Sequence, residues 1–395
     1  MESENIFMKR ADEIAEELVL YRRRFHQNPE IGMNTTATAT FVAEKLREMG
    51  YDPQIIAGCG VTATVGKAGG KVLLLRADMD ALPMQEDSGL EFASKVDGAA
   101  HCCGHDLHTA MLLGAARLLK EQESSLEGMV KLMFQPAEEN MQGARAMIEA
   151  GILENPKVDA AMAIHVNSIA VCGRLLVFAG PTCASSDLFT IKIKGHGGHG
   201  ARPEETVDPL NVAAHIHTAL QELQAREIRA GETGVLTIGC MKGGSTYNVI
   251  PNEAVMMGTI RTYNKGIRET LITRMQEIAT GIAHVFRAEA TIEFSDNYTI
   301  PLVSDQKMAT FAIDALRKAL PEDQILPMHQ SFPGSEDFAF IADKVPTLFV
   351  VLGATVKKGV EYGQHHPKVR FNEACLPVGA ATYAYLAAEW LKKNK

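Results

Sequence analysis

Three features are missing from this 395-residue sequence, and each absence narrows what the protein can be. Residues 1–10 lack the positive start and apolar segment of a secretion signal, so we do not expect export. No apolar run approaches the roughly 18 residues that a membrane-spanning helix requires. The basic residues are scattered and the formal net charge is −9, which argues against a nucleic acid or an anionic membrane as partner.

A disulfide framework is also missing. The seven cysteines are odd in number and irregularly spaced, and most lie inside apolar runs, a pattern that suits a reducing cytoplasm. With 46% hydrophobic and 22% charged residues, the composition is that of an ordinary globular protein. The length is sufficient for two domains, or for one domain with a large insertion. The sequence therefore predicts a cytoplasmic enzyme or binding protein.

Apolar strands alternate with helical segments at both ends of the chain. We expect strands at residues 61–65, 72–75, 129–134, 160–164 and 347–352, and helices at residues 106–120, 308–320 and 374–391. This alternation predicts an α/β fold in which a mostly parallel sheet is covered by helices on both faces.

The middle of the chain has a different pattern. Strands and helices are expected there in the order β-α-β-β-α-β, which is typical of a ferredoxin-like α+β unit. The sequence therefore predicts an inserted domain at residues 184–296, within a catalytic domain made of residues 1–183 and 297–395.

Side chains that bind metals or move protons cluster where the expected strands end. Four groups follow a strand: Asp78 with Asp80, Glu138 with Glu139, His165, and, one loop further on, His365. A fifth group, Cys103-Gly104-His105, directly precedes an expected helix. Because open α/β sheets bind ligands at the carboxyl ends of their strands, these groups can converge on one crevice.

Each group has an ordinary alternative. Cys103 and His105 are ligand types that suit zinc and its neighbours, but cysteine is often merely buried. Glu138 and Glu139 would repel each other unless a cation lay between them, yet such a pair can also be a solvated loop. His165 lies in an apolar stretch and could be a satisfied core residue. Five such groups together favour a metal-dependent active site.

Motifs from near residue 25 to near residue 370 resemble one family, in order along the chain. They are Phe25-His-Gln-Asn-Pro-Glu, Arg76-Ala-Asp-Met-Asp-Ala-Leu-Pro, Cys103-Gly-His-Asp-Leu-His, Phe134-Gln-Pro-Ala-Glu-Glu, Gly195-His-Gly-Gly-His, Tyr247-Asn-Val-Ile-Pro, Gly258-Thr-Ile-Arg and His365-His-Pro. The chain thereby resembles the amidohydrolase branch of the aminoacylase and carboxypeptidase family of co-catalytic zinc peptidases. Relatives in that branch include hippurate hydrolase, N-acetyl-diaminopimelate deacetylase and the auxin-conjugate amidohydrolases.

The resemblance implies a site for two divalent metal ions in each subunit. Cys103 would bridge the ions, His105 and His165 would complete one site, and Glu139 and His365 would complete the other. Glu138 would be the general base for a bridging hydroxide nucleophile. Because the ligands differ from those of the peptidase members, zinc, manganese, cobalt and nickel all remain open.

The inserted domain would act as a lid and as a dimerisation surface. By the same resemblance, His199 would stabilise the oxyanion. Arg261 is our candidate for binding the carboxylate of the substrate, because a planar guanidinium matches a carboxylate in a bidentate manner, and Asn248 would supply an amide donor.

The predicted reaction is hydrolysis of the amide bond of a small N-acyl amino acid by a homodimer or homotetramer. A dipeptidase or carboxypeptidase of the same family is the nearer alternative. A non-catalytic metal-binding relative is the more distant one.

Overall fold

The computed structural model describes residues 5–356 and 362–395. The chain divides into two compact units. Unit 1 consists of Met1–Thr182, Val303–Ser331 and Asp337–Lys395, and unit 2 consists of Cys183–Leu302 and Phe332–Glu336. Two short strands, β7 (Gly180–Cys183) and β14 (Leu302–Ser304), include points at which the chain passes from one unit to the other.

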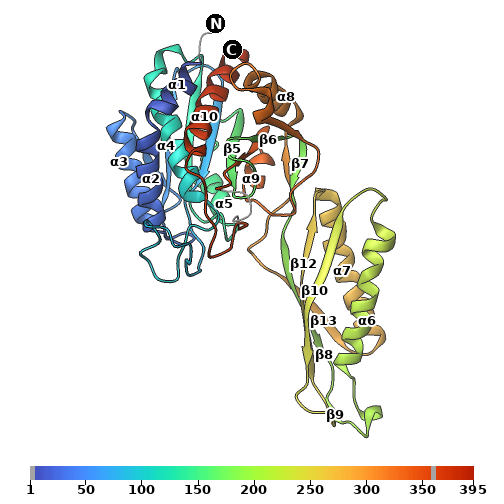
Figure 1. Cartoon of the computed structure of the whole chain (residues 1–395). Coiled ribbons are helices and arrows are strands. Elements are labelled where there is room, and N and C mark those ends of the chain that lie inside the picture. The colour runs from blue at the N-terminus through green and yellow to red at the C-terminus, as the bar shows by residue number, and fades with distance from the viewer. Residues whose placement is uncertain (1–4, 357–361) are drawn as a thin grey trace. The chain divides into compact units, whose positions relative to one another are not determined.

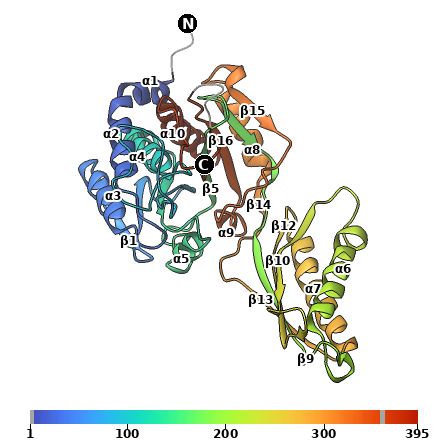
Figure 2. The ribbon, with the colours of Figure 1, turned by 60° about the horizontal axis from the view of Figure 1, so that its bottom comes forward.

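Unit 1 is built on one eight-stranded sheet (Figures 1 and 2). In spatial order its strands are β1 (Gln54–Ile56), β2 (Gly60–Gly66), β4 (Met129–Gln135), β3 (Val72–Asp78), β5 (Ala160–Asn167), β16 (Thr347–Gly353), β6 (Leu175–Phe178) and β15 (Ile325–Met328). The four central strands, β4, β3, β5 and β16, are all parallel, as the sequence predicts. Among the described strands of this sheet, antiparallel pairs occur only toward its two edges.

Helices cover this sheet. They are α1 (Ile6–Glu13), α2 (Ala15–Gln27), α3 (Thr36–Glu48), α4 (His105–Glu121), α5 (Gly143–Glu149), α8 (Gln306–Leu316), α9 (Ala339–Ala342) and α10 (Cys375–Lys393). The central pair, α4 and α10, pack against each other and against β3 (Figure 1). Among the described residues, no helix has the length and apolar character needed to cross a membrane.

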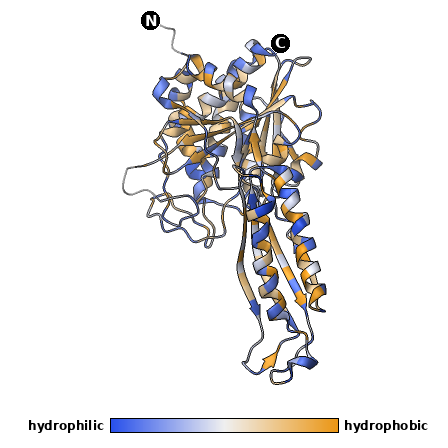
Figure 3. Ribbon diagram, turned by 90° about the vertical axis from the view of Figure 1, so that its right-hand side faces the viewer, coloured by the Kyte–Doolittle hydropathy of each residue, from blue (hydrophilic) through white to orange (hydrophobic). Residues whose placement is uncertain are grey.

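Burial explains why the central strands are almost wholly apolar. All seven residues of β3 and all seven of β16 are buried, so both faces of the sheet are covered at these strands. In Figure 3 the strands inside this unit carry much of the hydrophobic colour, whereas the helices around them carry both colours. The candidate site lies at the carboxyl ends of these buried central strands.

Unit 2 is a four-stranded antiparallel sheet with two helices. The chain order is β8 (Asp187–Lys194), α6 (Pro209–Glu222), β10 (Gly234–Gly243), β12 (Glu253–Thr262), α7 (Lys265–Val285) and β13 (Glu289–Phe294). The spatial order of the strands is β10-β12-β8-β13, and α6 and α7 pack on the sheet. A short pair, β9 (Gly198–His199) with β11 (Val249–Ile250), lies beyond the end of this sheet. The β-α-β-β-α-β order is that of a ferredoxin-like unit.

Candidate metal centre

Three neighbouring parallel strands bring the candidate residues to one edge of the unit 1 sheet. Asp78, the last residue of β3, lies opposite Gln135, the last residue of β4. The segments that follow these two strands therefore leave the sheet side by side. His165 lies near the end of β5, the next strand along.

A glycine between the two residues of the Cys-x-His motif permits a tight entry into α4. Gly104 has a φ of 102°, in the left-handed region, and a Cβ atom there would lie 2.4 Å from Cγ2 of Val166. Only glycine fits both requirements. Cys103 and His105 consequently face one centre from either side of Gly104.

Five side chains form two groups that share the Cys103 thiol. Ligand atoms of Cys103, His105 and His165 lie within 4.8 Å of one another, and so do those of Cys103, Glu139 and His365. Nε2 of His165 lies 3.5 Å from the Cys103 sulfur, and Nε2 of His365 lies 3.5 Å from a Glu139 oxygen. These are the five residues that the sequence predicts as ligands, and the structure brings them together.

The donor atoms fit a divalent transition metal. His105 donates from Nδ1 to the backbone carbonyl of Asp80, 2.8 Å away, so its Nε2 points into the cluster. That buried Nε2 and the Oε1 of Glu139 make no hydrogen bond. Thiolate, imidazole and carboxylate are the ligands that zinc and related ions take, and a bound ion would satisfy both orphaned atoms.

The electrostatics of the site point the same way. Burial, with the carboxylates of Asp80 and Asp78, raises the pKa of Glu139 to about 7. Burial and the neighbouring glutamates raise the pKa of the Cys103 thiol. Burial opposes the charge on His105, but Asp78, Asp80 and Glu139 outweigh it and raise its pKa to about 10. These raised pKa values follow from burying several acidic groups with little positive charge nearby, and a divalent cation would supply that charge.

Asp80 is a buried anchor for this cluster. Its carboxylate accepts the backbone N–H of Glu138 at 3.0 Å and that of Glu139 at 3.2 Å. Its backbone carbonyl accepts the hydrogen bond from His105. Asp80 thus fixes the glutamate pair and one imidazole at once, a role that its position after β3 alone does not reveal.

A buried arginine belongs to a hydrogen-bond network that reaches Glu138. The Arg76 guanidinium donates to Asp78 at 2.6 Å, to Gln135 at 2.9 Å and to Asp337 at 2.9 Å. Gln135 also donates to both carboxylate oxygens of Asp337. The backbone N–H of Asp337 donates in turn to the Glu138 carboxylate at 3.4 Å. The Glu138 side chain is therefore oriented by a charged network that spans three segments of unit 1.

Comparison with known proteins identifies the family of this chain. Residues 74–389 match the model of peptidase family M20/M25/M40. The chain belongs to this family. It is 38% identical to the IAA-amino acid hydrolase ILR1-like 4 of Arabidopsis thaliana, over 96% of this chain and 86% of that protein. It is also 38% identical to the N-acetylcysteine deacetylase of Bacillus subtilis, over 96% of this chain and 98% of that protein.

A solved structure agrees in fold and in the kind of site. The YXEP protein of Bacillus subtilis, described as a dinuclear metal binding peptidase from the M20 family, superposes with a TM-score of 0.83 at 34% identity. The match covers 96% of this chain and 99% of that one. The family assignment and the α/β fold with a mostly parallel sheet are confirmed.

A second buried charge network supports the loop that carries the Cys-x-His motif of this M20-family chain. Asp106 accepts from the Arg22 Nε at 2.8 Å, and its Oδ2 lies 2.7 Å from Nδ1 of His26. Nε2 of His26 lies 3.1 Å from a Glu86 oxygen. Burial opposes ionisation of Glu86, but hydrogen bonds from His26, Ser88 and the Ser94 backbone lower its pKa to about 2.

The three remaining predicted residues lie in unit 2, at opposite ends of its sheet. His199 is exposed in β9, a strand labelled in Figure 1, where it pairs with Val249, and Asn248 precedes that partner. Arg261 lies near the other end of β12, where its guanidinium donates to the Ser335 hydroxyl at 2.6 Å. The structure thus brings His199 and Asn248 together but separates both from Arg261.

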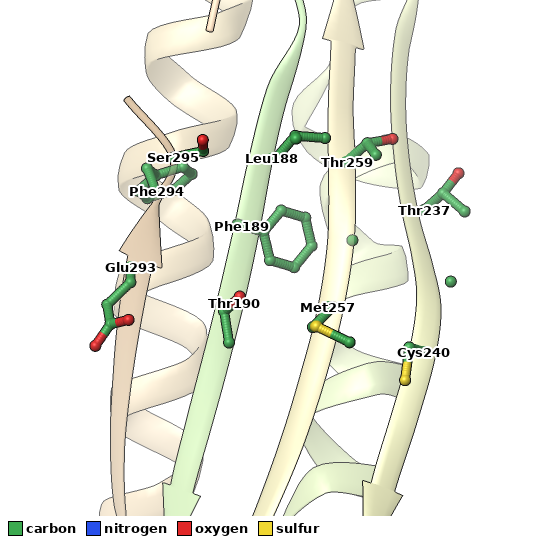
Figure 4. Close-up of a pocket in the computed structure, with 12 residues that line it drawn as sticks. Leu188, Phe189, Thr190, Thr237, Cys240, Met257, Thr259, Glu293, Phe294 and Ser295 are labelled. Carbon is green, nitrogen blue, oxygen red and sulfur yellow. The ribbon is translucent and has the colours of Figure 1, made fainter. Parts of the chain in front are cut away.

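A groove of about 580 Å³ lies on the open face of the unit 2 sheet (Figure 4). Its lining includes Leu188, Thr190, Thr237, Met257 and Thr259. None of the predicted ligands and none of the other predicted site residues line it. The groove therefore includes no part of the candidate metal centre, whose donor atoms belong to unit 1.

Proposed function

We propose that this protein is a metal-dependent amidohydrolase that cleaves the amide bond of N-acyl amino acids. The observation that carries the proposal is the pair of ligand groups that share Cys103, with Glu138 beside them. The names of its relatives, an IAA-amino acid hydrolase and an N-acetylcysteine deacetylase, support N-acyl amino acids as the substrate class.

Two ions would be held by the five predicted ligands. Cys103 would bridge them, His105 and His165 would complete one site, and Glu139 and His365 would complete the other. When bound, such ions polarise a carbonyl group and lower the pKa of water toward neutrality. Zinc, manganese, cobalt and nickel each suit this mixed sulfur, nitrogen and oxygen donor set.

Glu138 would move the protons. Its carboxylate is buried and points to the same centre as His105, with Oε2 of Glu138 3.9 Å from Nε2 of His105. Glu138 would accept a proton from the attacking water and then deliver it to the nitrogen of the leaving amine. Both steps use the same carboxylate, so the enzyme returns to its starting protonation state.

Arg261 would bind the carboxylate of the leaving amino acid. Its guanidinium is partly exposed and is held by Ser335, which leaves further donor groups for a ligand. A bidentate pair of this kind would require an N-acyl amino acid rather than a simple amide.

His199 and Asn248 would act in a neighbouring subunit. From Glu253 to Arg261 the strand rises about 27 Å, at 3.4 Å for each residue. Lys194 pairs with Glu253, and His199 lies beyond that end. One small substrate cannot reach both Arg261 and His199 of the same unit 2. We therefore propose a homodimer or homotetramer in which His199 contributes an oxyanion donor and Asn248 an amide donor to a partner's site.

A dipeptidase or carboxypeptidase activity is the second candidate, since the relative YXEP is described as a peptidase. A screen separates the two. Metal-free protein, supplemented in turn with zinc, manganese, cobalt or nickel, is assayed on a panel of N-acyl amino acids and on dipeptides. We expect cleavage of the acyl amino acids, loss of activity with chelator and recovery with one of the metals. Full activity after exhaustive chelation, with no metal detected, would refute the proposal.

A further inference from the structure

We propose that the backbone N–H and carbonyl groups of Val166 help to hold the ligands of both metal sites in place without binding a metal themselves. His108 and Gln364 act through these groups as positioning residues. The N–H of Val166 donates a hydrogen bond to His108, and the Val166 carbonyl accepts hydrogen bonds from His165 and Gln364. The inference rests on the proposed function, because it assumes that both ligand groups bind metal.

The N–H side is held by a buried histidine. His108 lies one turn into α4, and its Nδ1 donates to the carboxylate of Asp78, 2.5 Å away. The N–H of Val166 donates to Nε2 of His108 at 2.8 Å. One ring nitrogen donates and the other accepts, so the ring is neutral and its tautomer is fixed. His108 thereby ties the end of β5 to α4 and β3.

The carbonyl side receives two hydrogen bonds. His165 donates from Nδ1 to the Val166 carbonyl at 2.7 Å, which turns its Nε2 toward the Cys103 sulfur. Gln364 donates from Nε2 to the same carbonyl oxygen, also at 2.7 Å. A ligand of one metal group and the residue next to a ligand of the other group therefore share one acceptor.

His365 depends on such an anchor more than the other ligands do. Its side chain is 55% exposed, so packing does not hold it. Its φ is 63°, a left-handed conformation that is unfavourable for a residue with a Cβ atom. Such strain persists only where the surroundings over-determine it. Two backbone-directed hydrogen bonds do so here: His365 N–H to the Cys102 carbonyl at 3.0 Å, and Gln364 to Val166.

The expected effects on the two ions differ. Outer partners that orient a metal ligand typically contribute 10-fold to 100-fold in metal affinity. Loss of the Gln364 bond should weaken the ion held by Glu139 and His365. Loss of the His108 bond should weaken the ion held by His105 and His165.

The test is a calorimetric titration of metal-free protein with Co²⁺, followed in parallel by the cobalt absorption spectrum. Gln364→Glu keeps the size of the side chain but replaces the donor with an acceptor, so one of the two ions should bind about 10-fold to 100-fold more weakly. At one equivalent of Co²⁺ its spectrum should match that of Glu139→Gln, in which the same site is damaged. Gln364→Ala should behave like Gln364→Glu.

His108 offers a matched pair. The shorter amide of His108→Asn can reach Asp78 but not Val166, whereas the longer amide of His108→Gln can reach Val166. His108→Asn should weaken the other ion, with a cobalt spectrum unlike that of Glu139→Gln, and His108→Gln should bind it more tightly than His108→Asn does. The thermal midpoint of the metal-free protein should change little between the two.

The outcomes are distinct. A parent protein that binds no Co²⁺ would refute the proposed function. A parent that binds two ions, with Gln364→Glu and Gln364→Ala also binding both at parental affinity, would overturn the anchor alone. If the buried His108 variants fail to fold, the half-buried Gln364 pair still decides the matter.

Discussion

At the scale of single residues, the site combines acidic groups whose charges are costly to bury. Asp78, Asp80 and Glu138 are buried close to one another. The Arg76 guanidinium donates a hydrogen bond to Asp78. A buried carboxylate without compensation would take up a proton. Glu138 and Glu139 differ in how their carboxylates are compensated. Glu138 accepts a hydrogen bond from the Asp337 N–H, whereas Glu139 has a buried oxygen with no hydrogen bond.

That difference predicts separate phenotypes for the pair. Glu138→Gln should bind both metals with parental affinity and lower kcat by about 100-fold or more, the usual scale for loss of a general base. Glu139→Gln should instead lower metal affinity. Metal content of the dialysed proteins, measured beside kcat, checks both. If Glu138→Gln loses metal and Glu139→Gln keeps it, our assignment within the pair is reversed.

Glu86 predicts a pH dependence of stability. Its pKa is about 2 in the folded protein and 4.5 in the reference state, so ionised Glu86 stabilises the fold above pH 4.5. That contribution, about 2 kcal/mol after allowance for solvent screening, is lost as the pH falls from 4.5 to 2. The stability of Glu86→Gln should therefore fall less steeply over this interval.

The single tryptophan, Trp390, lies in α10 and reports on unit 1 during urea unfolding. Metal-free protein should be used, so that loss of metal in acid does not contribute. Parallel stability curves for the two proteins between pH 4.5 and 2 would show that Glu86 titrates normally.

At the scale of elements, the segment between β4 and α5 is constrained at both ends. It carries Glu138 and Glu139, and it turns sharply enough that Ala137 has a φ of 55°. Gly143, the first residue of α5, lies against the Pro136 carbonyl, where a Cβ atom would be only 1.6 Å from the oxygen. Any side chain at this glycine must displace the turn.

Gly143→Ala should accordingly destabilise unit 1 by about 2–4 kcal/mol and weaken metal binding, because the glutamates would move. The control lies at the other end of the same helix. Gly151 has a φ of 85° with open space around it, so Gly151→Ala should cost only about 1–2 kcal/mol. Urea unfolding followed by Trp390 fluorescence measures both. Equal losses in the two variants would contradict the steric argument.

The sequence predicts the central elements well because their signals are local. The apolar runs at β3, β4, β5 and β16 and the helical periodicity of α4 are visible without knowledge of the fold. The sequence does not predict β6 and β15, the last two strands at one side of the sheet, since each has four residues and no clear alternation. Their pairing depends on neighbours that are distant in sequence.

The candidate site likewise contains residues that the sequence predicts and residues that only the fold reveals. The predicted ligands stand out because their residue types are unusual at strand ends. The supporting residues do not: His108 reads as one more residue of a helix, Gln364 as a loop residue, and Asp337 as a charge far along the chain. Only the fold shows that they converge on the ligands.

At the scale of the whole molecule, the proposed contribution of His199 in trans can be tested by mixing subunits. His199→Ala should keep its metal and raise the barrier by about 3 kcal/mol, through loss of an oxyanion donor. Glu138→Gln should also be nearly inactive. Mixed dimers of the two would contain one intact site and should recover up to half of the parental activity per dimer. No recovery, with subunit exchange independently verified, would exclude action in trans.

The division of the chain into two units also determines how chimaeras between members of the family should be built. Unit 2 consists of the long segment Cys183–Leu302 and the short segment Phe332–Glu336. The short segment carries Ser335, which holds Arg261, and its Phe332 carbonyl accepts from the Tyr263 hydroxyl. A chimaera that takes only the long segment from a relative would combine the relative's residue at position 261 with Ser335 of this chain. Engineers who exchange substrate preference between relatives should therefore cut the gene in four places rather than two.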